Sequence, residues 1–112
     1  MLDLKKELEE LLNTFKLIKT SFKLDEKVQR LRQLEVESTV PSFWKDPTKA
    51  KEVMQQIASL SDELKEVDDL QKDLNTLGEL SKSPRENKDL EKDLVDIKKR
   101  LAFEIVRELN NE

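Results

Sequence analysis

Residues 41–80 read PSFWKDPTKAKEVMQQIASLSDELKEVDDLQKDLNTLGEL, a short loop with two aromatic residues followed by a long amphipathic segment. In that segment apolar residues recur every three or four positions, which is the spacing of one face of an α-helix. They are Val53, Ile57, Leu60, Leu64, Val67, Leu70, Leu74 and Leu77. The pattern predicts one continuous helix over residues 47–80, which at 1.5 Å per residue is about 50 Å long.

The loop before this helix carries its start signals and the single tryptophan of the chain. Asp46 can accept a hydrogen bond from a free backbone N–H of the first turn. Pro47 suits the first helical position because that position needs no N–H donor. The adjacent rings of Phe43 and Trp44 are large and apolar, so we expect both to fold back and close the end of a helical bundle. Exposure of the rings as a contact point for a partner is the alternative.

Two shorter amphipathic segments precede the loop. The first covers about residues 2–22, and its apolar residues form a heptad stripe. The second covers about residues 25–38, with Asp25 as the expected N-cap, and ends where Pro41 disfavours helical geometry in the residue before it. The stripes consist of Leu4, Leu8, Leu11, Phe15, Ile18 and Phe22 in the first segment and of Val28, Leu31 and Leu34 in the second.

A last amphipathic segment covers about residues 84–110. Ser83 and Glu86 can form a capping box at its start, with a proline between them at the first helical position. Gly78 is expected to close the preceding helix in a left-handed conformation. Because few residues separate the two helices, we expect them to form an antiparallel hairpin. The apolar face of the last segment consists of Leu90, Leu94, Ile97, Leu101, Ile105 and Leu109.

These segments together predict an all-α fold. We expect an elongated helical bundle with a coiled-coil-like antiparallel hairpin, built from three to four helices. A compact globule of 112 residues has a radius of gyration of about 13 Å, much less than the length of the longest predicted helix. We expect a single helical domain over residues 1–112 and interpret it as a fragment of a longer chain.

The composition excludes several kinds of chemistry. The chain has no Cys and no His, so imidazole or thiolate metal sites, Ser–His triads and disulfides are excluded. A single Gly cannot build a phosphate-binding loop. Neighbouring carboxylates on a helix point about 100° apart and do not converge on one reacting atom. We therefore expect no catalytic, cofactor-binding or metal-binding residue, no enzyme activity and no small-molecule substrate.

The charge balance limits the class of partner. With 21 basic and 25 acidic residues the formal net charge is −4, which argues against a dedicated binder of duplex nucleic acid. The densest basic cluster is Lys98-Lys99-Arg100, on an acid-rich helix where we expect local pairing; weak contact with rRNA is the alternative. No apolar run is long enough to cross a membrane, and the absence of Cys fits a cytoplasmic protein.

The most specific pattern is Pro-x-Phe-Trp-x-Asp-Pro at residues 41–47, preceded by a short helix that ends in Leu-Glu. With it this chain resembles the N-terminal domain of the bacterial peptide chain release factor 2 family. The residues that carry the resemblance are Leu24-Asp25, Lys27, Leu31, Leu34-Glu35, Pro41, Phe43-Trp44, Asp46-Pro47 and Ala50. We interpret the family motif Pro41, Phe43, Trp44, Asp46 and Pro47 as structural.

The resemblance implies a role in translation termination, in protein biosynthesis. Members of this family recognise UAA and UGA with a Ser-Pro-Phe motif and promote peptidyl-tRNA hydrolysis with a Gly-Gly-Gln loop; this chain contains neither. The domain would instead dock on the ribosome, at the large-subunit stalk base near ribosomal protein L11, and communicate with the GTPase release factor 3. Candidate contacts are the charged outer faces and residues 78–85. The alternative is a stand-alone coiled-coil adaptor or dimerisation module.

Overall fold

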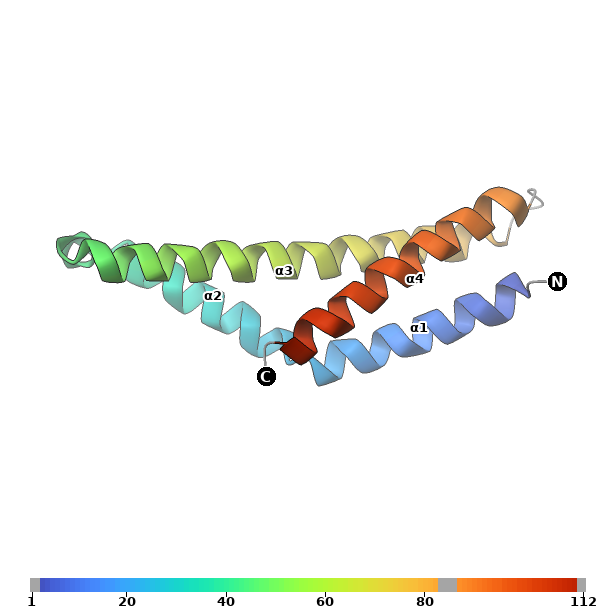
Figure 1. Ribbon diagram of the computed structural model, residues 1–112, viewed down its shortest axis with the longest axis horizontal. Coiled ribbons are helices and arrows are strands. Elements are labelled where there is room, and N and C mark those ends of the chain that lie inside the picture. Colours follow the sequence, from blue (N-terminus) through green and yellow to red (C-terminus); the bar gives the residue numbers. More distant parts are fainter. Residues whose placement is uncertain (1–2, 83–86, 111–112) are drawn as a thin grey trace. The chain divides into compact units, whose positions relative to one another are not determined.

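The computed structural model describes residues 3–82 and 87–110. These residues form helices and the turns between them, and none of them lies in a β-strand. The elements are α1 (Leu4–Ser21), α2 (Leu24–Ser38), the 3₁₀ helix η1 (Pro41–Lys45), α3 (Pro47–Leu80) and α4 (Asn87–Asn110) (Figure 1). The predicted all-α helical bundle is confirmed, and the bounds of α3 match the predicted 47–80.

The chain divides into two compact units, and α3 contributes to both. Unit 1 contains α1 with Phe22, the part of α3 from Val67 onward, and α4. Unit 2 contains residues 23–66, which comprise α2, η1 and the first part of α3.

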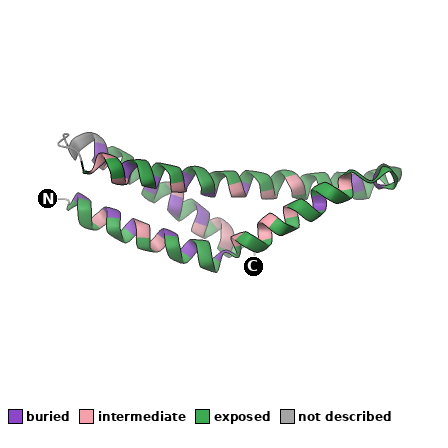
Figure 2. Cartoon of the chain, turned by 180° about the vertical axis from the view of Figure 1, so that it is seen from behind, coloured by how far each residue is buried: buried purple, intermediate pink, exposed green. Residues whose placement is uncertain are grey.

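Unit 1 is a three-helix bundle in which α1 and α4 run in one direction and α3 in the other (Figure 1). Each helix turns its apolar stripe inward, and the buried positions recur along one side of the helices (Figure 2). The core consists of Leu4, Leu8, Leu11, Phe15, Ile18, Phe22, Val67, Leu70, Leu74, Leu77, Leu90, Leu94, Ile97 and Leu101. The predicted stripe of the first helix is confirmed, as is the antiparallel pairing of α3 with α4.

The C-terminal turns of α4 differ from the prediction. Leu109, expected on the buried face, is exposed, and so are Phe103 and Val106. The heptad that begins at Leu90 continues through position 104, so Glu104 takes the next buried place. Its carboxylate forms an ion pair with Arg107.

Unit 2 is an antiparallel pair formed by α2 and the first part of α3 (Figure 1). Its core is small, with Ile57 and Leu60 packed at the margin of four buried side chains. A single partner helix leaves much of α3 open, which is why so few side chains are fully enclosed. The buried four are Leu34, Phe43, Ala50 and Val53.

An ion pair also joins the two helices of unit 2. The Nζ of Lys27 on α2 lies 2.6 Å from Oε1 of Glu63 on α3. The two side chains are only 18% and 10% exposed. This pair is therefore largely shielded from solvent, unlike an ordinary surface salt bridge.

The start of α2 corrects the predicted N-cap. The cap is Lys23, in the left-handed region at φ 53°, and Asp25 lies inside the first turn. A single left-handed residue interrupts the helical backbone between α1 and α2, although no glycine is available there. Asp25 still places negative charge near the helix N-terminus, where it is favourable.

The end of α3 corrects the predicted cap at Gly78. Its φ is not positive, and the helix continues through it to Leu80. The Ser81 N–H donates to the Leu77 carbonyl at 2.9 Å, and the Ser81 hydroxyl donates to the Gly78 carbonyl at 2.8 Å. These bonds satisfy carbonyls that a left-handed glycine would otherwise have served. The predicted capping box at residues 83–86 lies outside the described residues.

Candidate functional site

The candidate site is the loop at residues 39–46, and its first part is set by how α2 ends. The Ser38 hydroxyl donates to the Glu35 carbonyl at 2.7 Å, and the Thr39 hydroxyl donates to the Val36 carbonyl at 2.6 Å. These side chains satisfy acceptors of the last helical turn. Extended backbone at Val40 then leads into η1.

Phe43 and Trp44 have opposite environments in this loop. Phe43 is 9% exposed and packs in the core of unit 2, whereas Trp44 is 59% exposed. Their rings meet edge to face, with centroids 4.8 Å apart and planes at 85°. The prediction that both rings close the bundle is correct for Phe43 and wrong for Trp44. In a 3₁₀ helix of three residues per turn, successive side chains point about 120° apart, so a buried Phe43 directs Trp44 outward.

The second half of the motif begins α3, as predicted. The Lys49 N–H donates to Oδ1 of Asp46 at 3.2 Å, and Pro47 is the first residue of the helix. The Ala50 N–H donates to the Asp46 carbonyl at 2.9 Å. Pro41 stands at the first position of η1, where a missing N–H leaves nothing unsatisfied. Both prolines and Asp46 therefore fix the backbone on either side of the aromatic pair.

Three lysines follow Trp44 closely in the sequence. Lys45, Lys49 and Lys51 belong to the same η1–α3 junction, and all three are exposed. The acidic neighbour Asp46 already accepts a hydrogen bond as the cap of α3. An exposed indole beside lysines can enter an apolar pocket or stack on a nucleic acid base, with the lysines near phosphates or carboxylates.

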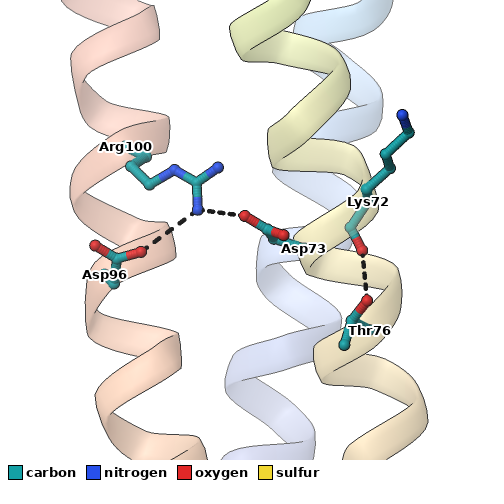
Figure 3. Close-up of polar contacts among 5 residues, drawn as sticks. All are labelled: Lys72, Asp73, Thr76, Asp96 and Arg100. Atoms are coloured by element: carbon teal, nitrogen blue, oxygen red, sulfur yellow. Dashed lines mark hydrogen bonds and ion pairs between the residues drawn. The ribbon is translucent and has the colours of Figure 1, made fainter.

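Two residues of the basic cluster on α4 are engaged in ion pairs. The Nζ of Lys98 lies 2.5 Å from Oε2 of Glu7 on α1. Nη1 of Arg100 lies 2.6 Å from Oδ2 of Asp73 on α3 and 3.4 Å from Oδ2 of Asp96 (Figure 3). The predicted pairing within the helix is confirmed for Arg100, through Asp96, whereas Lys98 pairs with another helix. Both pairs also join α4 to neighbouring helices of unit 1.

Ion pairing raises the pKa of two cations in unit 1. The hydrogen bond to Asp73 is the main cause that raises the pKa of Arg100 above its ordinary value, and partial burial opposes it. The hydrogen bond to Asp68 likewise raises the pKa of Lys72. Beside it, the Lys72 carbonyl accepts a hydrogen bond from the Thr76 hydroxyl at 3.0 Å (Figure 3). Both cations stay charged at any physiological pH.

A groove of about 1120 Å³ lies between α1 and the end of α3 in unit 1. Leu8 and Leu74 line it together with side chains of both charge signs. Gly78 adds room: a Cβ there would find Cδ2 of Leu8 as its nearest neighbour, at 4.0 Å. This is ordinary contact distance, so the glycine is not required by close packing. The other lining residues are Asp3, Leu4, Lys5, Glu9, Leu12, Asn75, Glu79, Ser81 and Lys82.

No group of three or more His, Cys, Asp or Glu side chains in residues 3–82 and 87–110 is arranged to hold a metal ion. Within the same ranges, none of the helices has the length and apolar character that crossing a membrane requires. Comparisons with protein-family models, curated proteins and solved structures gave no match.

Proposed function

We propose that this chain is the helical accessory domain of a class I translation termination factor that recognises UAA and UGA. The observation that carries the proposal is the 41–47 loop. Its prolines and Asp46 set the backbone, Phe43 anchors it in the core, and Trp44 is held outside. The same residues carry the resemblance to the release factor 2 family.

The proposed task is docking, and the chain has no catalytic role in it. The partners are the large-subunit stalk base near ribosomal protein L11 and the GTPase release factor 3, in the cytoplasm. A preformed contact loses little conformational entropy on binding, and the indole of Trp44 is already oriented by the Phe43 ring. Exposed lysines at the same junction suit a surface rich in rRNA phosphate.

Binding to ribosomal subunits tests this proposal directly. Fluorescently labelled chain is sedimented with large subunits that contain or lack ribosomal protein L11. We expect binding to the complete subunits and clearly weaker binding without L11. Trp44→Ala should weaken binding because it removes the exposed ring, whereas Leu17→Ala, which truncates an exposed side chain on α1, should not. Equal sedimentation with both kinds of subunit, or none with either, would refute the stalk-base assignment.

A termination assay separates docking from chemistry. The chain is added in excess to ribosomes stalled at UGA, with full-length release factor 2 and the GTPase release factor 3. We expect the chain alone to release no peptide and to slow the turnover of the full-length factor by competition. Peptide release by the chain itself would contradict the docking role.

One observation favours a second candidate, a stand-alone coiled-coil adaptor or dimerisation module. Phe103, Val106 and Leu109 are each more than half exposed on α4, and exposed apolar residues in line are typical of a helix that meets another helix. Sedimentation equilibrium distinguishes the candidates. A dimer at micromolar concentration would favour the dimerisation module, and a monomer would remove it.

A further inference from the structure

Helix α4 carries two heptad seams on different sides. The first is the buried stripe from Leu90 to Glu104, which packs in unit 1. The second lies on the outer side and places apolar residues at Val95, Ala102, Val106 and Leu109, with spacings of seven, four and three. These four residues are exposed, with values of 50%, 55% and 61% for Val95, Val106 and Leu109.

The outer seam has the register of a coiled coil. Val95, Ala102 and Leu109 occupy one repeating position, which corresponds to d of a heptad. The other repeating position, a, is occupied by Lys92, Lys99 and Val106. We call these six residues the outer seam of α4.

We propose that the outer seam of α4 is a docking surface for an acidic amphipathic helix of a partner protein. The apolar face of that helix covers the d residues and Val106. Its carboxylates lie opposite Lys92 and Lys99. This inference does not depend on the role proposed in termination.

The charge of the seam selects the acidic partner. Lys92 and Lys99 are exposed, and neither forms an ion pair within the part of the chain that the structure describes. Their neighbour Lys98 is already engaged by Glu7, and Asp96 is engaged by Arg100. A helix that covers the apolar residues must therefore supply the negative charge itself.

The same lysines argue against a second copy of this chain as the occupant. In a parallel pair, Lys92 and Lys99 would each face the same lysine of the other copy, which is repulsive. In an antiparallel pair the lysines would face apolar d residues without a carboxylate partner.

Phe103 extends the surface at its edge. Its ring is 59% exposed, and the guanidinium carbon of Arg107 lies 5.3 Å from the ring centroid. This cation–π contact restricts the ring before any partner arrives, which reduces the entropy lost on docking. The seam therefore has an oriented aromatic anchor next to its apolar stripe.

Helical peptides with defined heptads serve as the probe. One labelled peptide of three heptads carries Glu at every a position and Leu at every d position; the matched control carries Lys at a. Fluorescence anisotropy measures the binding of each peptide to the full 112-residue chain. We expect micromolar binding of the acidic peptide and about tenfold weaker binding of the basic one, since like charges at a oppose pairing.

Charge reversal makes the test specific to the seam. Lys99→Glu should weaken binding of the acidic peptide by about tenfold and strengthen binding of the basic peptide. Lys16→Glu, the same change at an exposed position on α1, should leave both affinities unchanged. Circular dichroism checks that each variant keeps its helix content.

Three results would overturn the proposal. They are equal affinity for the two peptides, absence of binding to either, and insensitivity of binding to Lys99→Glu. A dimer of the chain that Val106→Asp dissociates would also overturn it, because the occupant would then be a second copy.

Discussion

The two halves of α3 carry the same heptad pattern but are buried to different depths. In unit 1, Leu70, Leu74 and Leu77 are each only 1% exposed. In unit 2, Leu60 and Leu64 occupy equivalent positions of the stripe and are half-buried. The first set packs between α1 and α4, whereas the second meets α2 alone. Apolar periodicity therefore identifies the side of a helix that is buried, and the number of neighbouring helices sets the depth.

The polar contacts follow the same division. In unit 2 the Lys27–Glu63 pair is shielded from solvent and lies beside a small core. In unit 1 the Arg100–Asp73 pair lies at the edge of the bundle, with side chains 36% and 51% exposed. A shielded pair is costly to break because the remaining charge loses a counter-charge that little water can replace, whereas an exposed pair contributes little.

The largest effect is expected from truncating the deepest apolar position. Leu74→Ala should lower the free energy of unfolding by about 4 kcal/mol, because it leaves a cavity among three helices. Leu60→Ala, the matched change in unit 2, should cost about 1 kcal/mol, since half of that side chain is already in contact with water. Urea unfolding followed by circular dichroism measures both. Equal losses would show that the number of neighbouring helices does not control the cost.

The adjacent aromatic residues offer a comparison within unit 2. Phe43→Ala should cost about 3 kcal/mol because it removes a buried ring from a small core. Trp44→Ala should cost less than about 1 kcal/mol because the indole is mostly in solvent. Urea unfolding is again followed by circular dichroism and not by tryptophan fluorescence, since one variant lacks the only tryptophan. A larger loss for Trp44→Ala than for Phe43→Ala would reverse the assignment of core and surface.

The third prediction compares the two kinds of ion pair. Glu63→Gln should cost about 2 kcal/mol, because it removes the negative charge that lies 2.6 Å from the shielded Lys27 ammonium. Asp73→Asn should cost about 0.5 kcal/mol, as is usual for an exposed pair. Both values come from urea unfolding at low and high salt, and salt should diminish only the second. Similar costs would mean that Lys27 is better solvated than its burial indicates.

The last prediction is a gain in stability. Gly78→Ala should raise the stability of unit 1 by about 1 kcal/mol, because the residue is helical and a Cβ has room beside Leu8. Ala58→Gly, at an exposed position of α3 in unit 2, should lower stability by about the same amount. Thermal unfolding by circular dichroism measures both shifts. Destabilisation by Gly78→Ala would indicate that the packing between α1 and α3 requires the space that glycine leaves.

The local signals of the sequence were reliable where backbone chemistry is self-contained. Asp46 and Pro47 correctly predicted the start of α3, because a cap and its proline act within one turn. Two predicted caps failed, Asp25 and Gly78. Asp and Gly are favoured at helix ends, but neither residue type has to end a helix. Nothing local marked Lys23 as the left-handed residue, since lysine rarely adopts that conformation.

The candidate site was predicted only in part. The sequence identified the 41–47 motif, but the roles of its rings depend on which of two adjacent residues meets the core, and composition does not distinguish them. The outer seam of α4 was not predicted. Its heptad spacing is present in the sequence, but its exposure cannot be read there, because Val106 and Leu109 would be equally apolar if another helix covered them.

The sequence by itself determined the helices and most of their buried sides, because the period of 3.6 residues is a property of each segment alone. Only the tertiary structure decided which stripe lies between two neighbours and which beside one, that Trp44 faces solvent, and that α4 keeps a second apolar side open. Those outcomes depend on contacts between residues distant in the chain, and a periodic pattern carries no information about how many partners a helix has.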